Sequence, residues 1–119
     1  MSLTHTIESE FDNGAYYFII TLHCVNDCYE NEISLCDHDH IDVWKNLIKH
    51  IKSDTEYAYG SGGNSFSTIG VKDGNVNICS NVSGSGGDIT TTFKVRKEIF
   101  LPIAKKIIDE MQLFILLNA

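Results

Sequence analysis

The sequence predicts an α+β fold, a two-layer sandwich in which one antiparallel five-stranded sheet carries two helices on one face. Two observations support it. Several short segments alternate between apolar and polar residues and are joined by tight-turn dipeptides, and two longer segments place apolar residues at helical spacing. The predicted order is β-β-α-β-β-β-α. The 119 residues fit a single domain, 1–119, with no internal repeat.

The first two predicted strands, residues 3–11 and 15–24, form a hairpin around Asn13-Gly14. Asn-Gly is typical of a type I′ turn, because both central residues need a positive φ. This turn sets a register that brings the apolar residues of both strands onto one face. The predicted facing pairs are Asp12 with Ala15, Phe11 with Tyr16, Ile7 with Ile20 and Leu3 with Cys24.

The other face of this hairpin carries Tyr17 and Ile19 beside Glu8 and Glu10. Alternation along a strand sends neighbouring side chains to opposite faces, so these residues point away from the core. Tyr17 and Ile19 are therefore predicted surface anchors.

Residues 25–38 are predicted to be a polar, acidic connection, in which Ile33 and Leu35 allow a short extra strand. A helix follows over 39–53, with Asp37 or Asp39 capping its first turn. The apolar residues of this helix recur at helical spacing. They are Ile41, Trp44, Leu47, Ile48 and Ile51.

The second half is predicted to contain three strands and a closing helix. The strands cover 65–71, 75–82 and 89–95, with Asp73-Gly74 as a turn and the glycine-rich segments 59–64 and 83–88 as flexible loops. Pairing across the turn aligns Ile69 and Val71 with Val76 and Ile78, and Phe93 then faces Ile78. The helix runs from about 98 to 116, with Pro102 in its first turn. Its predicted buried stripe is Phe100, Ile103, Ala104, Ile107, Ile108, Met111, Phe114 and Ile115.

The formal net charge is −7, and it is unevenly distributed. Residues 1–60 hold eleven acids and three lysines, whereas residues 61–119 hold five acids and six bases. Such an acidic chain lacks the basic surface that nucleic acids and anionic membranes require, so neither is expected as a partner. The N-terminus lacks a secretion signal and no segment has transmembrane length, which predicts a cytoplasmic protein with reduced cysteines.

A cysteine and histidine cluster offers an alternative function, a metal-binding protein or small metalloenzyme. Its candidate ligands are Cys36, His38, His40 and Cys28, with His23 and Cys24 upstream. These residue types suit zinc, but their spacing matches neither a helix face nor a paired finger motif. The favoured interpretation is a polar segment with reduced thiols, hence no metal and no cofactor.

No catalytic motif is present, and the sequence predicts that the protein is not an enzyme. The glycine-rich segments lack the Gly-Lys of a phosphate-binding loop, and they lead into strands rather than helices. Ser85 lies between glycines but outside a Gly-x-Ser-x-Gly elbow.

The expected function is protein binding, with a basic protein as partner. Its predicted contact residues are acids of the 25–40 connection and two tyrosines beside the first glycine-rich segment. They are Asp27, Glu30, Glu32, Asp37, Asp39, Tyr57 and Tyr59. A further alternative is a structural protein that self-associates into a homo-oligomer through an exposed sheet edge.

Several short motifs of the second half resemble a known layout. They are the runs 62–69 (Gly-Gly-Asn-Ser-Phe-Ser-Thr-Ile), 72–78 (Lys-Asp-Gly-Asn-Val-Asn-Ile), 86–88 (Gly-Gly-Asp) and 93–95 (Phe-Lys-Val), followed by a closing helix. In layout the chain is similar to small bacterial immunity proteins of polymorphic-toxin systems. The resemblance implies a cytoplasmic, non-catalytic protein that blocks a toxin domain by binding it, and it assigns no individual residue.

Overall fold

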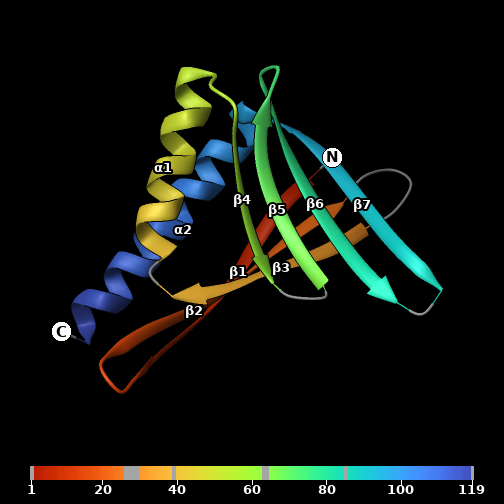
Figure 1. Cartoon of the computed structure of the whole chain (residues 1–119). Helices are drawn as coiled ribbons and strands as arrows, with labels where there is room; N and C mark the ends of the chain where they lie inside the picture. Colours follow the sequence, from red (N-terminus) through yellow and green to blue (C-terminus); the bar gives the residue numbers. More distant parts are fainter. Residues whose placement is uncertain (1, 26–29, 39, 63–64, 85, 119) are drawn as a thin grey trace.

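Over the residues that it describes (2–25, 30–38, 40–62, 65–84 and 86–118), the computed structural model contains seven strands and two helices (Figure 1). Side chains are described for 2–25, 41–56, 68–79, 86–87, 90 and 92–118. The elements are, in order, β1 (Ser2–Asp12), β2 (Ala15–Val25), β3 (Glu30–His38), α1 (His40–Ser53), β4 (Tyr57–Gly62), β5 (Ser65–Lys72), β6 (Asn75–Gly84), β7 (Gly87–Arg96) and α2 (Lys97–Leu117).

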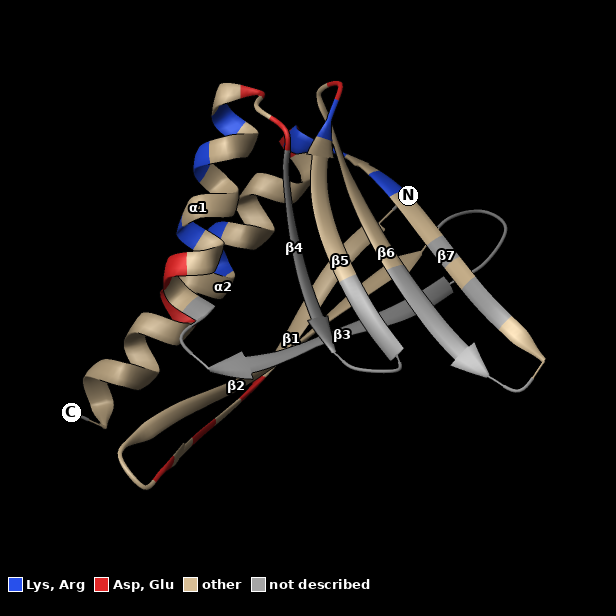
Figure 2. Cartoon of the chain, viewed as in Figure 1, with Lys and Arg blue, Asp and Glu red and all other residues tan. Residues whose placement is uncertain are grey.

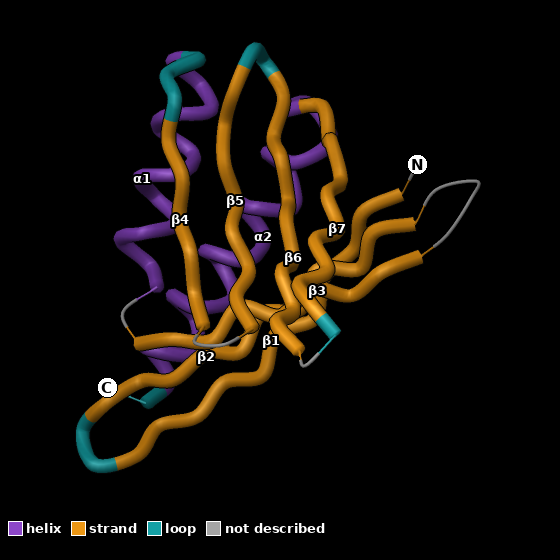
Figure 3. Tube along the Cα trace, turned by 45° about the vertical axis from the view of Figure 1, so that its right-hand side comes forward, coloured by secondary structure: helices purple, strands orange, loops and turns teal. Residues whose placement is uncertain are grey.

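The α+β class is confirmed, but the single five-stranded sheet is wrong. The strands form two separate antiparallel sheets, a three-stranded sheet in the order β1-β2-β3 and a four-stranded sheet in the order β4-β5-β6-β7. The five predicted strands keep their predicted order and divide between the sheets, two in one and three in the other. Figure 3 shows the strands of the two sheets crossing, with β3 passing next to β4, β5 and β6.

The predicted strand registers are confirmed. Around the first turn, where Asn13 and Gly14 both have positive φ, all four predicted facing pairs are in register. In the second sheet, Ile69 pairs with Ile78, which in turn pairs with Phe93. Each correct register sends one apolar row inward, because successive side chains alternate between the two faces of a strand.

Both sheets and both helices share one hydrophobic core. α2 connects the two sheets, because it packs against β1 and β2 as well as β6 and β7. In α1, Trp44 is fully buried and its ring stacks on that of Phe100 of α2, with 6.2 Å between the ring centroids. The predicted apolar stripes of both helices are buried or half-buried in this core.

Three local predictions are corrected. The segments 59–64 and 83–88 are mostly strand, since β4 extends to Gly62, β6 to Gly84, and β7 starts at Gly87. Pro102 lies beyond the first turn of α2, because the helix begins at Lys97. At this position the proline removes one hydrogen bond of the helix.

Among the described helices, none combines the length and the hydrophobicity that crossing a membrane requires. α2 is long, with 21 residues, but charged residues recur along it. Its charged residues are Lys97, Glu98, Lys105, Lys106, Asp109 and Glu110.

Candidate docking surface

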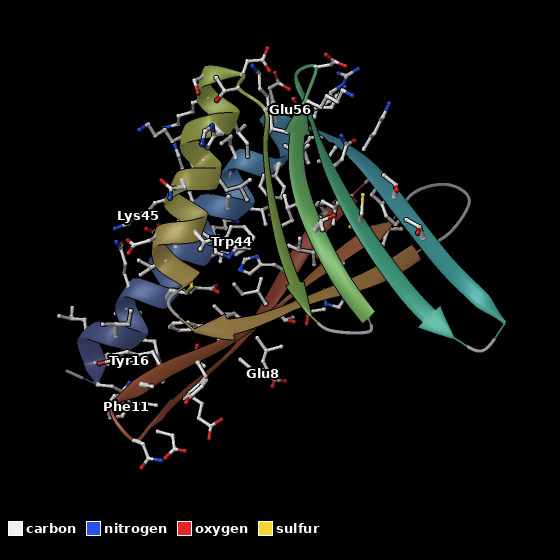
Figure 4. All side chains as sticks on the ribbon, viewed as in Figure 1. Glu8, Phe11, Tyr16, Trp44, Lys45 and Glu56 are labelled. Carbon is white, nitrogen blue, oxygen red and sulfur yellow. The ribbon has the colours of Figure 1, made fainter. Side chains whose placement is uncertain are left out.

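The outer face of the β1–β2 hairpin carries two carboxylates beside two exposed apolar groups. The register places Glu8 opposite Ile19 and Glu10 opposite Tyr17. Ile19 is 39% exposed and Tyr17 36% exposed. Together with Ser9 these four residues line a pocket of about 210 Å³. Figure 4 shows Glu8 on the side of the hairpin that faces away from the helices.

Tyr17 and Ile19 point outward because their neighbours along β2 belong to the core. Phe18 and Ile20 of β2 are fully buried on the inner face of the sheet. Alternation along the strand therefore turns Tyr17 and Ile19 to the outer face, as predicted from the sequence. The exposure of two large apolar side chains here follows from their position in the strand.

The three-stranded sheet carries acids on its two outer strands, β1 and β3. Its strands contain six acids and no lysine or arginine, whereas the strands of the four-stranded sheet contain three basic residues and one acid. In Figure 2, acidic residues mark β1 near the hairpin turn, and basic residues mark the ends of β5 and β7 near the helices. The acids are Glu8, Glu10, Asp12, Glu30, Glu32 and Asp37.

The carboxylates of Glu8 and Glu10 are available for a partner. Among the described residues, the contact between a histidine and a carboxylate lies elsewhere: the His5 ring nitrogen is 3.1 Å from the Glu110 carboxylate and connects β1 to α2. Glu8 and Glu10 are two positions apart on one strand, so they face the same side and repel each other. A cation bound between them would relieve this repulsion.

The hairpin turn is fixed against the end of α2. The hydroxyl of Tyr16 donates to the carbonyl oxygens of Ile115 at 3.4 Å and Asn118 at 3.5 Å. Its ring lies between those of Phe11 and Phe114, with centroid distances of 4.8 and 6.2 Å. Figure 4 shows Phe11 and Tyr16 beside the last turn of α2. The outer face thus belongs to a hairpin that is anchored at its turn as well as at its base.

The predicted contact acids of the connection fall partly on β3. Glu32 pairs with His23 and Glu30 pairs with Val25, so both occupy register positions next to β2. Asp37 also lies on β3, and its partner is Phe18. The structure does not describe the side chains of these three acids. Asp27 and Asp39 lie outside the described residues entirely.

The predicted tyrosines lie on β4, where Tyr57 pairs with Val71 and Tyr59 with Ile69. Their side chains also lie outside the described residues. β4 belongs to the four-stranded sheet, so the structure does not bring these tyrosines into the same sheet as the predicted acids.

The candidate metal ligands are divided among three segments. Cys36 and His38 occupy β3, paired with Ile19 and Tyr17, and His40 is the first residue of α1. Cys28 lies outside the described residues, as do the side chains of the other three. The metal-binding hypothesis therefore stays a prediction.

A second exposed apolar surface lies at the end of α2. Leu113, Leu116 and Leu117 are all exposed, and their spacing places them on one face of the helix. Asp109 and Glu110 lie one helical turn before Leu113, and both are exposed.

No protein-family model matches this chain, no curated protein is significantly similar to it, and no solved structure matches its fold.

Proposed function

We propose that the protein is a non-catalytic binding module that holds a basic protein partner on the outer face of the three-stranded sheet. One observation carries the proposal. The pocket between Glu8, Glu10, Tyr17 and Ile19 combines two carboxylates with two exposed apolar groups, in a sheet whose strands contain no lysine or arginine.

This combination suits protein recognition on physical grounds. Tyrosine is enriched at the centres of protein interfaces, because its ring buries a large apolar area and keeps a polar end. Surrounding carboxylates attract a basic partner, raise its association rate and disfavour acidic competitors. Glu30 and Glu32 extend the acidic surface along β3 at the register positions next to Val25 and His23.

The resemblance to small bacterial immunity proteins of polymorphic-toxin systems implies a non-catalytic protein that blocks a toxin domain by binding it. If that resemblance holds, we propose that the basic partner is such a toxin domain. A homo-oligomer through this face is disfavoured, because the same carboxylates of two copies would face each other.

Charge reversal tests the proposed surface. The wild type and the variant Glu8→Lys/Glu10→Lys are immobilised and exposed to host lysate at low salt, and captured proteins are identified by mass spectrometry. We expect the wild type to retain a basic protein that the variant loses. A charge-matched control is Glu56→Lys/Asp109→Lys, since both acids are exposed and lie outside the three-stranded sheet, Glu56 just before β4 and Asp109 on α2.

The control variant should retain the same captured protein, and added salt should release it. The proposal is wrong if wild type and Glu8→Lys/Glu10→Lys capture the same proteins, or if the control loses the partner equally. Circular dichroism of all three proteins checks that the substitutions leave the fold intact.

A further inference from the structure

We propose that two copies of this chain associate through α2, whose exposed face packs antiparallel against the same face of the second copy. α2 covers the inner side of the sheets, so this interface lies away from the outer face of the three-stranded sheet. The inference therefore does not rest on the proposed function. It rests on the spacing of the exposed residues of α2, on two opposite charges at their centre and on the apolar side chains at their ends.

The exposed face of α2 has the spacing of a coiled-coil seam. Six exposed residues follow one another at alternating intervals of three and four, which is the heptad pattern of positions that face a partner helix. α2 already buries a separate apolar stripe in the core, so the core does not account for this second one. The residues of this exposed seam are Ile99, Pro102, Lys106, Asp109, Leu113 and Leu116.

The ends of the exposed seam are apolar. Leu113 is 56% exposed and Leu116 73% exposed, and Figure 1 shows this part of α2 extending past α1. The helix is packed here, because the ring of Phe114 on its other side lies 5.9 Å from that of Phe18, measured between centroids. Contact with a second helix would remove the exposed leucine surface from water, which favours association.

A two-fold axis at the middle of the exposed seam brings complementary residues together. In an antiparallel pair, Lys106 of one copy faces Asp109 of the other, and the symmetry repeats this pair with the roles of the copies exchanged. Two pairs of opposite charge therefore lie at the centre, and apolar residues meet apolar residues on both sides of them. The apolar pairs are Pro102 with Leu113 and Ile99 with Leu116.

The central charges determine the orientation of the two helices. In a parallel pair, Lys106 would face Lys106 of the second copy and Asp109 would face Asp109, and like charges at facing positions disfavour association. Within the part of the chain that the structure describes, neither residue has an ion-pair partner. Polar residues in a seam fix its register, so the centre specifies the antiparallel arrangement while the apolar ends supply affinity.

Charge substitutions at the centre of the seam test the dimer. Sedimentation equilibrium of the full chain is measured from micromolar to millimolar concentration at low salt. We expect the weight-average mass of the wild type to rise from 13.3 kDa toward twice that value, because a contact of one helix face per copy dissociates on dilution. Lys106→Asp and Asp109→Lys should each stay monomeric, since each substitution places like charges opposite each other.

Mixing the two variants provides the most specific result. An equimolar mixture of Lys106→Asp and Asp109→Lys should dimerise, because the acid introduced in one copy faces the lysine introduced in the other. The unchanged Asp109 and Lys106 face each other in the same complex. Two controls accompany the mixture. Lys94→Asp, exposed on β7, should dimerise like the wild type, and Leu116→Ser should weaken the dimer without changing the circular dichroism spectrum.

Three results would overturn the inference. They are a wild type that stays at 13.3 kDa over the whole range, a Lys106→Asp variant that dimerises alone, and a mixture of two folded variants that remains monomeric. Glu8→Lys/Glu10→Lys should dimerise like the wild type, so the dimer and the docking surface can fail separately. The control used for partner capture contains Asp109→Lys, and it should be monomeric while it retains the basic partner.

Discussion

The two sheets share one core but differ on their outer faces. On the inner side, both present rows of fully buried aliphatic and aromatic residues to the same helices. On the outer side, the three-stranded sheet exposes Tyr17 and Ile19 beside acids, whereas the four-stranded sheet carries small polar and basic residues. The described outer residues of the latter include Thr68, Lys72, Asn75, Asn77, Cys79, Thr90, Thr92, Lys94 and Arg96.

This difference shows which outer face has features beyond those needed for folding. Small polar residues on a solvent-facing sheet are expected wherever only one face is buried. Exposed Tyr17 and Ile19 contribute little to the core, and the like charges of Glu8 and Glu10 on one face disfavour the fold. Under the proposed function, their coincidence around a pocket reflects contact with a partner.

The largest expected effect is a loss of folding stability that differs between the two faces of β2. Ile20 is fully buried and Ile19 is its exposed neighbour. Ile20→Ala should lower the free energy of unfolding by about 2–5 kcal/mol, because it leaves a cavity in the core. Ile19→Ala should lower it by only about 1 kcal/mol, the span of strand propensities, because its side chain is partly exposed. Urea unfolding of both variants measures the difference.

Ile78→Ala provides the matched control in the other sheet, because Ile78 is also fully buried. Its loss should resemble that of Ile20→Ala, since both residues belong to the same core. Equal losses for Ile19→Ala and Ile20→Ala would contradict the assignment of the two faces.

The sequence sufficed to predict the parts of the fold that depend on local pattern. The Asn13-Gly14 turn fixed the register of β1 and β2, because a two-residue turn leaves one pairing that keeps the apolar rows together. The helical stripes were predictable for a similar reason, since spacing alone determines which side of a helix can be buried.

The division into two sheets could not be predicted in this way. Alternation shows that a segment is a strand, but it does not show which strands pair across a long separation. β4 was missed because its glycines disfavour strand formation, and here pairing with β5 compensates. β3 was considered only as a short extra strand, because acidic residues are rare in strands; pairing with β2 extends it over Glu30–His38.

The candidate site was predictable in part. Alternation placed Tyr17 and Ile19 beside Glu8 and Glu10 on the outer face, which the structure confirms. The pocket between them was not predictable, because its shape depends on side-chain conformations across two strands. The predicted contact residues were instead the acids of 25–40, because acids are denser there in the sequence.

The next prediction compares two cysteines in the two sheets. Cys24 is fully buried on the inner face of β2, and burial raises the pKa of its thiol from 9.0 to about 11. Cys79 is half-buried on the outer face of β6, where its sulfur lies 3.5 Å from the hydroxyl oxygen of Thr92. At pH 8, iodoacetamide should modify Cys79 faster than Cys24, as measured by peptide mass spectrometry.

The same difference predicts a loss of stability in alkaline solution. The folded state favours the neutral Cys24 thiol, so its contribution is fully present below pH 9 and is lost as the pH rises toward about 11. The free energy of unfolding should therefore fall more between pH 8 and pH 10.5 in the wild type than in Cys24→Ala. Cys79→Ser should retain the wild-type fall, and a fall that vanishes in Cys79→Ser instead would contradict the assignment.

The smallest expected effect concerns the basic ends of the four-stranded sheet. Lys94 and Arg96 are exposed on β7, on a different sheet from the proposed pocket. Lys94→Glu/Arg96→Glu makes the chain more acidic but leaves Glu8, Glu10, Tyr17 and Ile19 in place. Capture of the basic partner at low salt should therefore be retained or slightly increased, because added acids attract a basic protein. A marked fall in capture would mean that the four-stranded sheet takes part in binding, because distant added acids can only attract a basic protein.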